Sequence, residues 1–387
     1  MSIIGRNMSE YDIKVLHFGR FYNDKFGGTE RYVNTLLENI KDVIRVDNFV
    51  ANEGFSNEII RKDGYNIYKA ACLGMLNSVP ICPFMPLWLR HLNVKTGYDI
   101  IHLHFPDPMS HLAAYALPAN TKVVISWHSD VIRQKKALKL YRPFLDHIIK
   151  RADAIIAATP KHFTSSTQLN EADSSKCHVI PYGIDYSSFQ NPEAIEAAIP
   201  IREKYGNKKI IFTVGRHVYY KGYEYLIRAM RKVEDGILLL GGSGPLTSQL
   251  QEIAYGAGVT DKVVFLGRIS EKELPSYYHA SDLFCLPSIE PSEAFGIVQI
   301  EAMACKKPVI CCELNNGVTY VNKNGITGIV VPPRDSDSLS RAINELLADD
   351  EKRLRMGVAG YHHATTEFSI SQMCDKTIKL YKHILNR

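Results

Sequence analysis

Short apolar runs alternate with amphipathic segments along almost the whole chain. The first half contains five such runs: IKVLHF, DIIHLHF, KVVISW, ADAIIAA and CHVIPY. Residues 29–40 and 136–152 lie between them and carry apolar side chains at three- and four-residue spacing, which predicts helices. Strand and helix patterns that alternate in this way are typical of parallel sheets whose strands are joined by crossover helices.

A second series of apolar runs occupies the other half: IIFTVG, GILLLGG, VVFLG, DLFCLPS, PVICC and TGIVVPP. Their nearly uniform apolar character predicts strands that are covered on both faces. The 387 residues therefore indicate an α/β protein with two doubly wound, Rossmann-like domains that face each other across a cleft. We expect the first domain in residues 1–190 and the second in residues 191–368, with a closing helix in 369–387 that packs back on the first.

Composition narrows the classes of function. The formal net charge is +5, which is too small to indicate a nucleic-acid partner. The eight cysteines have no metal-ligand spacing and lie mostly in apolar runs, which indicates reduced, buried thiols. The N-terminus lacks the apolar core of a signal peptide, and no apolar run approaches the ~20 residues of a membrane span. We therefore expect a cytoplasmic protein, with any contact at the inner face of the cell membrane being peripheral.

The stretch EAFGIVQIEAMA places two carboxylates, Glu293 and Glu301, on either side of a predicted helix start at Phe295–Gly296. Eight helical residues span ~12 Å, so the two acids are poorly placed to share one metal ion. They can instead contact two parts of one elongated ligand whose middle lies at the helix N-terminus, where anionic groups are favoured. A nucleotide-sugar has this shape. The alternative is a capping glutamate followed by a solvated helix residue.

Basic side chains and glycines follow other strands of the second series. Arg216 comes directly after one strand, and Lys221 opens the next helix, which suits a diphosphate ligand. Gly244, in the turn GGSGP, allows a close approach of the backbone. Each feature is weak alone, because solvated cations and glycine-rich turns are common after strands.

In this order, the segments GRHVYYKG, GGSGP, LGRIS and ASDLFCLPS and the pair Glu293 and Glu301 resemble the family-4 retaining glycosyltransferases of GT-B architecture, over essentially the whole chain. The resemblance implies that Arg216 and Lys221 bind the diphosphate of the donor. It also implies that Glu301 holds the ribose hydroxyls and Glu293 the hydroxyls of the donor sugar.

The same resemblance implies further donor contacts, and makes the second domain the nucleotide-sugar-binding one and the first the acceptor side. The backbone of four residues would lie against sugar and phosphate: Phe295, Gly296, Ile297 and Val298. Arg268 and Ile269 would lie beside the base, and Gly244 in the glycine turn of the donor site.

Two features of the first half also match the family. Gly27 and Gly28 precede a predicted helix, like the glycine loop that the family places near the phosphates; the alternative is a capping turn at Thr29. His128 follows the strand at 122–127, where the family has a histidine that reaches the donor sugar. The alternative is a packed histidine at a strand end.

The implied reaction is transfer of a hexose from a nucleoside-diphosphate sugar with retention of configuration and without a metal cofactor. Four residues would carry it: His128, Arg216, Lys221 and Glu293. The segment WHSDVIRQKK is similar to bacterial surface-polysaccharide mannosyltransferases, such as those of O-antigen in lipopolysaccharide, which favours GDP-mannose. UDP-linked N-acetylglucosamine, glucose and galactose stay open as donors, and the expected acceptor is a glycan on polyprenyl diphosphate.

Three other patterns favour structural roles or stay open. Asp335–Asp337, DSD, precedes a helical segment and is typical of a helix cap rather than of a metal-binding DxD motif. His102 and His104 share one face of a strand, but no third ligand follows at metal spacing, so we expect packing. The basic, amphipathic segment 133–151 fits either a solvated helix or one that contacts anionic lipid.

Other classes of protein fit less well. A dinucleotide-dependent oxidoreductase needs G-x-G-x-x-G directly after a strand, and the segment GRFYNDKFGG after the first strand lacks this pattern. A non-catalytic protein that binds a nucleotide-sugar has the same ligand residues, so the sequence leaves it open.

Overall fold

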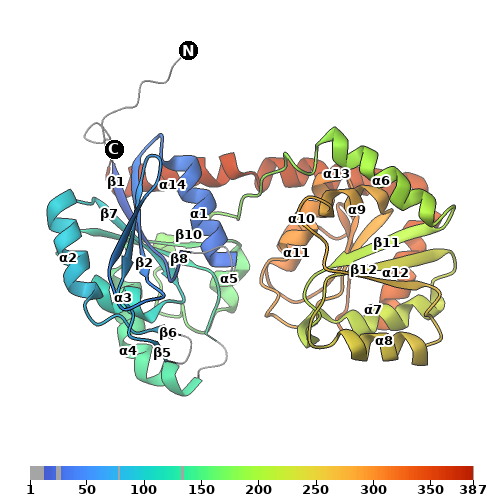
Figure 1. Cartoon of the computed structure of the whole chain (residues 1–387), viewed down its shortest axis with the longest axis horizontal. Coiled ribbons are helices and arrows are strands. Elements are labelled where there is room, and N and C mark those ends of the chain that lie inside the picture. Colours follow the sequence, from blue (N-terminus) through green and yellow to red (C-terminus); the bar gives the residue numbers. More distant parts are fainter. Residues whose placement is uncertain (1–12, 23–27, 77–78, 132–134, 387) are drawn as a thin grey trace, which may run out of the picture. The chain divides into compact units, whose positions relative to one another are not determined.

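The computed structural model describes residues 13–22, 28–76, 79–131 and 135–386. The chain divides into two compact units (Figure 1), Met1–Tyr182 with Ile370–Arg387, and Gly183–Ser369. The division after Tyr182 lies upstream of the position 190 that the sequence suggested, and the chain re-enters the first unit at Ile370.

The first unit is built on an eight-stranded sheet with the order β10-β9-β8-β7-β1-β2-β4-β3. Within it, only β3 runs antiparallel to its neighbour. The strands are β1 (Lys14–Phe18), β2 (Arg45–Ala51), β3 (Glu58–Arg61), β4 (Asn66–Ala70), β7 (Ile100–Phe105), β8 (Lys122–Trp127), β9 (Ala154–Ala157) and β10 (Cys177–Val179). A separate hairpin pairs β5 (Met75–Leu76) with β6 (Val79–Pro80).

The apolar pattern did not predict strands β3 and β4, the hairpin of β5 and β6, or the strand β2. Its buried Asp47 and Asn48 interrupt the run of apolar residues. Asp47 is accommodated because it accepts hydrogen bonds from the Tyr98 hydroxyl (2.6 Å) and the Asn66 backbone N–H (2.7 Å). These partners lie far away in the sequence, so the local pattern carries no sign of them.

Helices cover both faces of the first sheet. They are α1 (Gly28–Ile40), α2 (Met85–Thr96), α3 (Pro108–Ala114), α4 (Lys135–Arg151), α5 (Pro160–Ser165) and α14 (Ile370–Ile384). Successive residues of β1 enter opposite cores: Leu16 and Phe18 pack with α2, α3 and α4, whereas Val15 packs with α1 and α14. This two-sided burial explains why the strands are apolar at nearly every position.

The second unit has a six-stranded, fully parallel sheet with the order β13-β12-β11-β14-β15-β16. The strands are β11 (Lys209–Val214), β12 (Gly236–Gly241), β13 (Val263–Gly267), β14 (Leu283–Leu286), β15 (Val309–Cys312) and β16 (Gly328–Val331). The helices are α6 (Pro192–Lys204), α7 (Tyr223–Ala229), α8 (Thr247–Gly256), α9 (Leu274–Ala280), α10 (Ile297–Ala304), α11 (Val318–Val321), α12 (Ser336–Ala348) and α13 (Asp350–Glu367). The predicted doubly wound α/β architecture is confirmed.

Both sheets reverse their strand order at one point. In the second unit this switch point lies between β11 and β14, and in the first unit between β1 and β7. Ligands of doubly wound sheets bind beyond the carboxyl ends of the strands at such a point. The topology therefore directs attention to the loops that follow these four strands.

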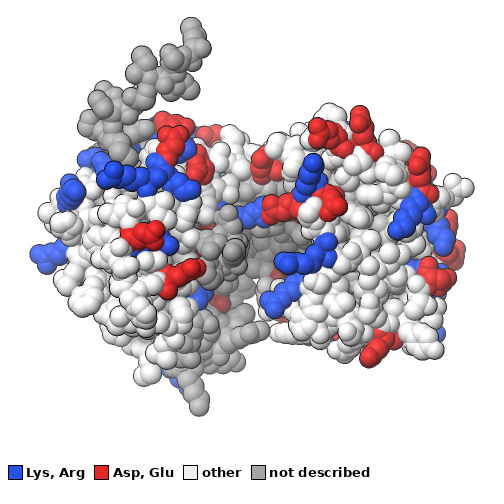
Figure 2. Space-filling view, viewed as in Figure 1, with Lys and Arg blue, Asp and Glu red and all other residues white. Residues whose placement is uncertain are grey.

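The DSD segment and the cysteines have the structural roles that the sequence predicted. The Asp335 carboxylate accepts hydrogen bonds from the backbone N–H groups of Asp337 and Ser338, so the DSD segment caps α12. All eight cysteines are free thiols, and seven of them are buried. Within the described ranges, no helix is both long and apolar enough to cross a membrane. Acidic and basic side chains are interspersed on the face shown in Figure 2.

Candidate active site

Loops at the carboxyl edge of the second sheet are joined by backbone hydrogen bonds. The N–H of His217, after β11, donates to the Ser243 carbonyl after β12 (3.0 Å). The N–H of Ile289, after β14, donates to the Tyr220 carbonyl (2.8 Å). The switch point between β11 and β14 is therefore surrounded by loops that hold one another in place.

Two glycines are required by this arrangement. A Cβ atom on Gly244 would lie 2.5 Å from the His217 carbonyl oxygen, so only glycine lets the loops after β11 and β12 approach each other. Gly296 is the residue before α10 and has φ +71°, which L side chains rarely adopt. The helix consequently begins at Ile297, directly after the Phe295–Gly296 start predicted from the sequence.

Lys221 and Glu293 form an ion pair next to these loops. Lys221 Nζ lies 2.5 Å from Glu293 Oε2, and the Ser288 hydroxyl donates to the same oxygen (2.9 Å). Both charged side chains are only 11% exposed. Burial first and the nearby Glu293 second raise the pKa of the Tyr223 hydroxyl well above its usual value, so this neighbour stays protonated. Lys221, the residue predicted to bind phosphate, and Glu293, the residue predicted to bind sugar, are thus in direct contact with each other.

Glu301 belongs to a separate part of the edge. It lies in the second turn of α10, and its Oε2 accepts a hydrogen bond from the buried Tyr278 hydroxyl (2.8 Å). Glu293 and Glu301 therefore have different hydrogen-bond partners.

The remaining predicted residues of the second unit differ in exposure. The side chains of Arg216 and Arg268 are exposed, and the Arg216 guanidinium makes no hydrogen bond or ion pair with any described residue. The Phe295 ring is buried and packs against Phe368, and its backbone carbonyl accepts a hydrogen bond from the Gln299 side chain (3.3 Å). Ile269 packs its side chain close to Gly241. Ile297 is 38% exposed at the first turn of α10.

In the first unit, His128 follows β8 and is 8% exposed. Its Nε2 lies 3.1 Å from His104 Nδ1, and its Nδ1 lies 2.9 Å from the Tyr182 hydroxyl. Burial lowers the pKa of His128 to about 3, so the imidazole is neutral at neutral pH.

The glycine loop of the first unit is described only in part. Gly28 is the first residue of α1 and is exposed, whereas Gly27 lies outside the described residues. Thr29 is consequently inside the helix, and the alternative interpretation of Thr29 as its N-cap is wrong.

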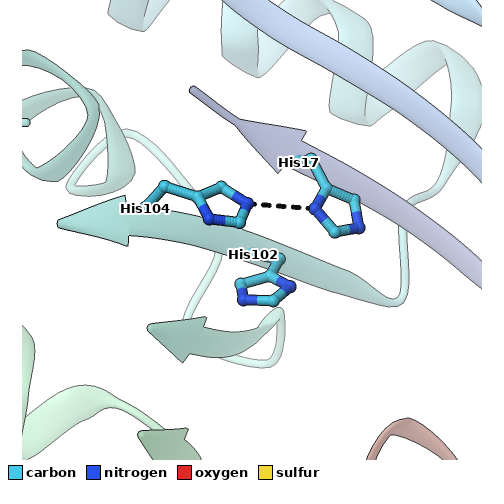
Figure 3. Close-up of side chains that lie close together, drawn as sticks. All are labelled: His17, His102 and His104. Atoms are coloured by element: carbon cyan, nitrogen blue, oxygen red, sulfur yellow. Dashed lines mark hydrogen bonds between the residues drawn. The ribbon is translucent and has the colours of Figure 1, made fainter. Parts of the chain in front are cut away.

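Some residues of these sites carried no signal in the sequence. Ser288 and Tyr278, the partners of the two glutamates, come from different elements and look like ordinary loop and helix residues. His17 is the third histidine beside His102 and His104 (Figure 3), and it comes from another strand, β1. Spacing along the chain could not reveal it, because strand pairing alone brings His17 opposite His102.

Two family models match successive parts of the chain. Glycosyltransferase Family 4 matches residues 26–188, and Glycosyl transferases group 1 matches residues 194–363. The D-rhamnosyltransferase WbpZ of Pseudomonas aeruginosa is 31% identical over 348 residues, covering 89% of both chains. The chain belongs to the family-4 glycosyltransferases.

Other similarities agree with this family. The O-antigen chain mannosyltransferase C of Escherichia coli is 28% identical to this glycosyltransferase over 375 residues, which are 96% of this chain and 99% of that protein. The structure of sucrose-phosphate synthase from Thermosynechococcus elongatus superposes with a TM-score of 0.77, over 97% of this chain and 99% of that one, at 23% identity. The fold of this family-4 glycosyltransferase is therefore GT-B.

Proposed function

We propose that this glycosyltransferase moves a hexose from a nucleoside-diphosphate sugar to an acceptor hydroxyl, with retention of configuration and without a metal ion. The observation that carries the proposal is the Lys221–Glu293 pair beside the switch point of the second sheet. A cation and a carboxylate in contact there suit a ligand in which phosphate and sugar are adjacent.

The residues would act on charge that develops during the reaction. As the bond between the anomeric carbon and the phosphate oxygen breaks, Arg216 and Lys221 stabilise the negative charge on the diphosphate. The acceptor hydroxyl attacks the same face of the sugar and passes its proton to the departing phosphate oxygen. Glu293, released from Lys221 by the incoming phosphate, accepts hydrogen bonds from the sugar hydroxyls.

Other residues would position the donor. Glu301 binds the ribose hydroxyls, and His128 binds the sugar through a ring nitrogen. The backbone at 296–298 and at Gly28 lies along sugar and phosphate, where free N–H groups at the start of α10 favour anionic groups. Arg268 and Ile269 lie beside the base.

Mannose from GDP-mannose is the donor that we favour, with a lipid-linked glycan of cell-surface polysaccharide as acceptor. One relative is named an O-antigen chain mannosyltransferase and another a GDP-mannose-dependent mannosyltransferase of phosphatidylinositol monomannoside. A UDP-sugar is the alternative donor.

Helix α4 supports contact with an anionic membrane at the cytoplasmic face, because Leu140 is 82% and Phe144 45% exposed on a basic helix.

The diphosphate assignment is tested by Arg216→Ala and Lys221→Ala. Each substitution should lower turnover more than tenfold while circular dichroism stays unchanged, because transition-state charge loses a cation. Lys232→Ala is the control, since Lys232 is 64% exposed and pairs with Asp337 of the same unit. Near-normal turnover in both site variants would remove the assignment.

The donor is tested by calorimetric titration with GDP and UDP in the presence of a chelator. Tighter binding of GDP supports GDP-mannose, tighter binding of UDP supports the alternative, and loss of binding with chelator contradicts metal independence. Transfer from the matching sugar nucleotide would exclude a non-catalytic binding protein.

A further inference from the structure

Four buried histidines form a row of hydrogen-bonded rings in the first unit. His17 lies on β1, His102 and His104 on β7, and His128 directly after β8. Their exposed fractions are 0%, 0%, 2% and 8%. Figure 3 shows the first three side by side at the switch point between β1 and β7, with the hydrogen bond between His17 and His104 dashed.

Six hydrogen bonds join these rings into one chain that ends at two hydroxyl groups. In order, the contacts are Ser126 Oγ–His102 Nε2 (2.8 Å), His102 Nδ1–Tyr381 Oη (2.6 Å), Tyr381 Oη–His17 Nε2 (3.3 Å), His17 Nδ1–His104 Nε2 (3.1 Å), His104 Nδ1–His128 Nε2 (3.1 Å) and His128 Nδ1–Tyr182 Oη (2.9 Å). We call the four histidines with Tyr381, which lies on α14, the histidine relay.

A metal ion fits the relay poorly, although ring nitrogens of His17, His102 and His104 lie within 4.8 Å of one another. All six ring nitrogens of these histidines already have protein partners, so a cation would have to break several hydrogen bonds. Burial lowers the pKa values of all three, neighbouring histidines lower those of His102 and His104 further, and no described carboxylate contributes. The surroundings favour neutral rings.

If all the rings are neutral, every hydrogen bond in the relay must point the same way, from donor to acceptor. A neutral imidazole has one N–H donor and one acceptor nitrogen, and a hydroxyl donates once. If His17, His104 or His128 were reversed, two donors or two acceptors would face each other; if His102 alone were reversed, the Tyr381 O–H would lose its acceptor among these rings. Either arrangement is costly in a buried site. All four histidines must therefore carry their proton on the same nitrogen, either all on Nε2 or all on Nδ1.

The two hydrogen-bond distances of the Tyr381 hydroxyl favour one of these two tautomer arrangements. The 2.6 Å contact with His102 Nδ1 is the length of a hydroxyl that donates, and the 3.3 Å contact with His17 Nε2 suits an N–H that donates to the Tyr381 oxygen. Both choices place the protons on Nε2. In this state His128 Nδ1 is an acceptor, and the Tyr182 hydroxyl donates to it.

We propose that the histidine relay holds His128 as the neutral Nε2–H tautomer and presents its Nδ1 as a hydrogen-bond acceptor, with Tyr381 as a positioning residue. The consequence for substrate rests on the proposed function: a hydroxyl of the donor sugar donates to Nδ1 in place of Tyr182. His128 then binds the sugar as an acceptor and supplies no proton to the reaction.

The first test is NMR of the ring nitrogens in donor-free, histidine-labelled protein at neutral pH. Signals of the four relay histidines are assigned by single substitutions, and all four should report the Nε2–H form. A mixture of tautomers, the Nδ1–H form in all four, a charged ring, or zinc bound in one equivalent by these nitrogens would each overturn the proposal.

The second test is Tyr381→Phe, which removes the hydroxyl that joins His102 to His17. Without it, the remaining rings can reverse, so His128 should populate both tautomers. The apparent affinity for the donor falls with the fraction of His128 that is in the Nε2–H form. If half of the molecules have this form, the donor KM rises about twofold, with a smaller change in kcat. If His128 of the variant still gave only the Nε2–H signal, the positioning role of Tyr381 would be contradicted. A donor KM that does not follow the measured fraction of the Nε2–H form would contradict it as well.

Tyr98→Phe is the matched control. Tyr98 is also buried in the first unit, and its hydroxyl donates to Asp47 at 2.6 Å, outside the relay. It should lose stability without changing the His128 tautomer or the donor KM. The two proposals fail separately: absence of any transfer with a uniform Nε2–H relay rejects the proposed function, whereas mixed tautomers in an active enzyme reject the relay.

Discussion

Lys221 and Glu293 form the ion pair on which the proposed reaction depends most directly. Each is 11% exposed and so has lost most of its water, and each compensates the charge of the other. Ser288 adds a second hydrogen bond to the carboxylate. A pair that is largely buried and held by few contacts can exchange partners when a ligand brings its own charge and hydroxyl groups.

The pair can be measured with a double-mutant cycle. Lys221→Met should lower the free energy of unfolding by about 2 kcal/mol, because it leaves the Glu293 carboxylate without its cation. Lys221→Met combined with Glu293→Gln should cost at least about 1 kcal/mol less than the sum of the single changes. Urea unfolding followed by circular dichroism gives these values. Additive single effects would show that the two charges do not stabilise each other.

At the scale of elements, the site depends on how loops approach at the carboxyl edge of the second sheet. Gly244 permits the contact between the loops after β11 and β12, and the Gly296 conformation sets where α10 begins. Neither function requires a side chain. The same edge therefore places backbone N–H groups, rather than only charged side chains, next to the proposed ligand.

Gly244→Ala tests this loop contact. The new Cβ meets the backbone of His217, so the loops must separate, and we expect a loss of more than about 1 kcal/mol of unfolding free energy together with weaker nucleotide binding. Gly256→Ala is the control, because a Cβ there meets nothing within 4 Å and helix α8 should gain up to about 1 kcal/mol. Equal effects of both substitutions would contradict the claim that Gly244 is needed for the two loops to approach each other.

The cap of α12 gives a second prediction at this scale. Asp335→Ala removes the acceptor for two backbone N–H groups and should cost about 1 kcal/mol of stability. Transfer activity and its response to Mg²⁺ or Mn²⁺ should stay unchanged, as measured in assays with and without chelator. A large loss of metal-stimulated activity would instead support a metal role for the DSD segment.

At the scale of the whole molecule, strongly buried histidines are concentrated in the first unit. Burial lowers the pKa of His17, His111 and His128 to about 3, and holds the pKa values of His102 and His104 well below 6.5. Folding keeps these rings neutral, while the unfolded chain protonates them below about pH 6.5. Their contribution to stability is therefore complete above that pH and is lost as the pH falls toward 3.

The first unit should consequently be sensitive to acid. Each of the five histidines lowers the unfolding free energy by up to about 1.4 kcal/mol per pH unit below pH 6.5. Asp107 and Asp47 have the opposite sign, because burial raises their pKa values, that of Asp107 to about 7, and their contributions are lost as the pH rises, but they are two groups against five. Urea unfolding followed by fluorescence of Trp88 and Trp127, both in the first unit, measures the slope.

The control for this slope is His111→Gln. His111 lies outside the relay, against Phe105 and Tyr141, so its loss should lower the proton uptake on unfolding by about one without changing the relay. A stability that is independent of pH between 6.5 and 4 would contradict the assignment of five neutral, buried rings.

The sequence by itself determined the parts of this protein that depend on local pattern. Apolar runs followed by glycine, proline or a charged residue located β11 to β16, and the segment around Gly296 located the start of α10. Period, turn chemistry and helix boundaries are properties of neighbouring residues. The family followed from motifs of the same kind.

Only the tertiary structure decided which distant groups meet. Lys221 and Glu293 are 72 positions apart, and Tyr381 contacts His17 across 364 positions. The polar strand β2 and the histidine relay are stable because strand pairing and helix packing supply their hydrogen-bond partners. No local pattern records these partners, since a buried polar side chain looks in the sequence like an exposed one until the fold provides its contacts.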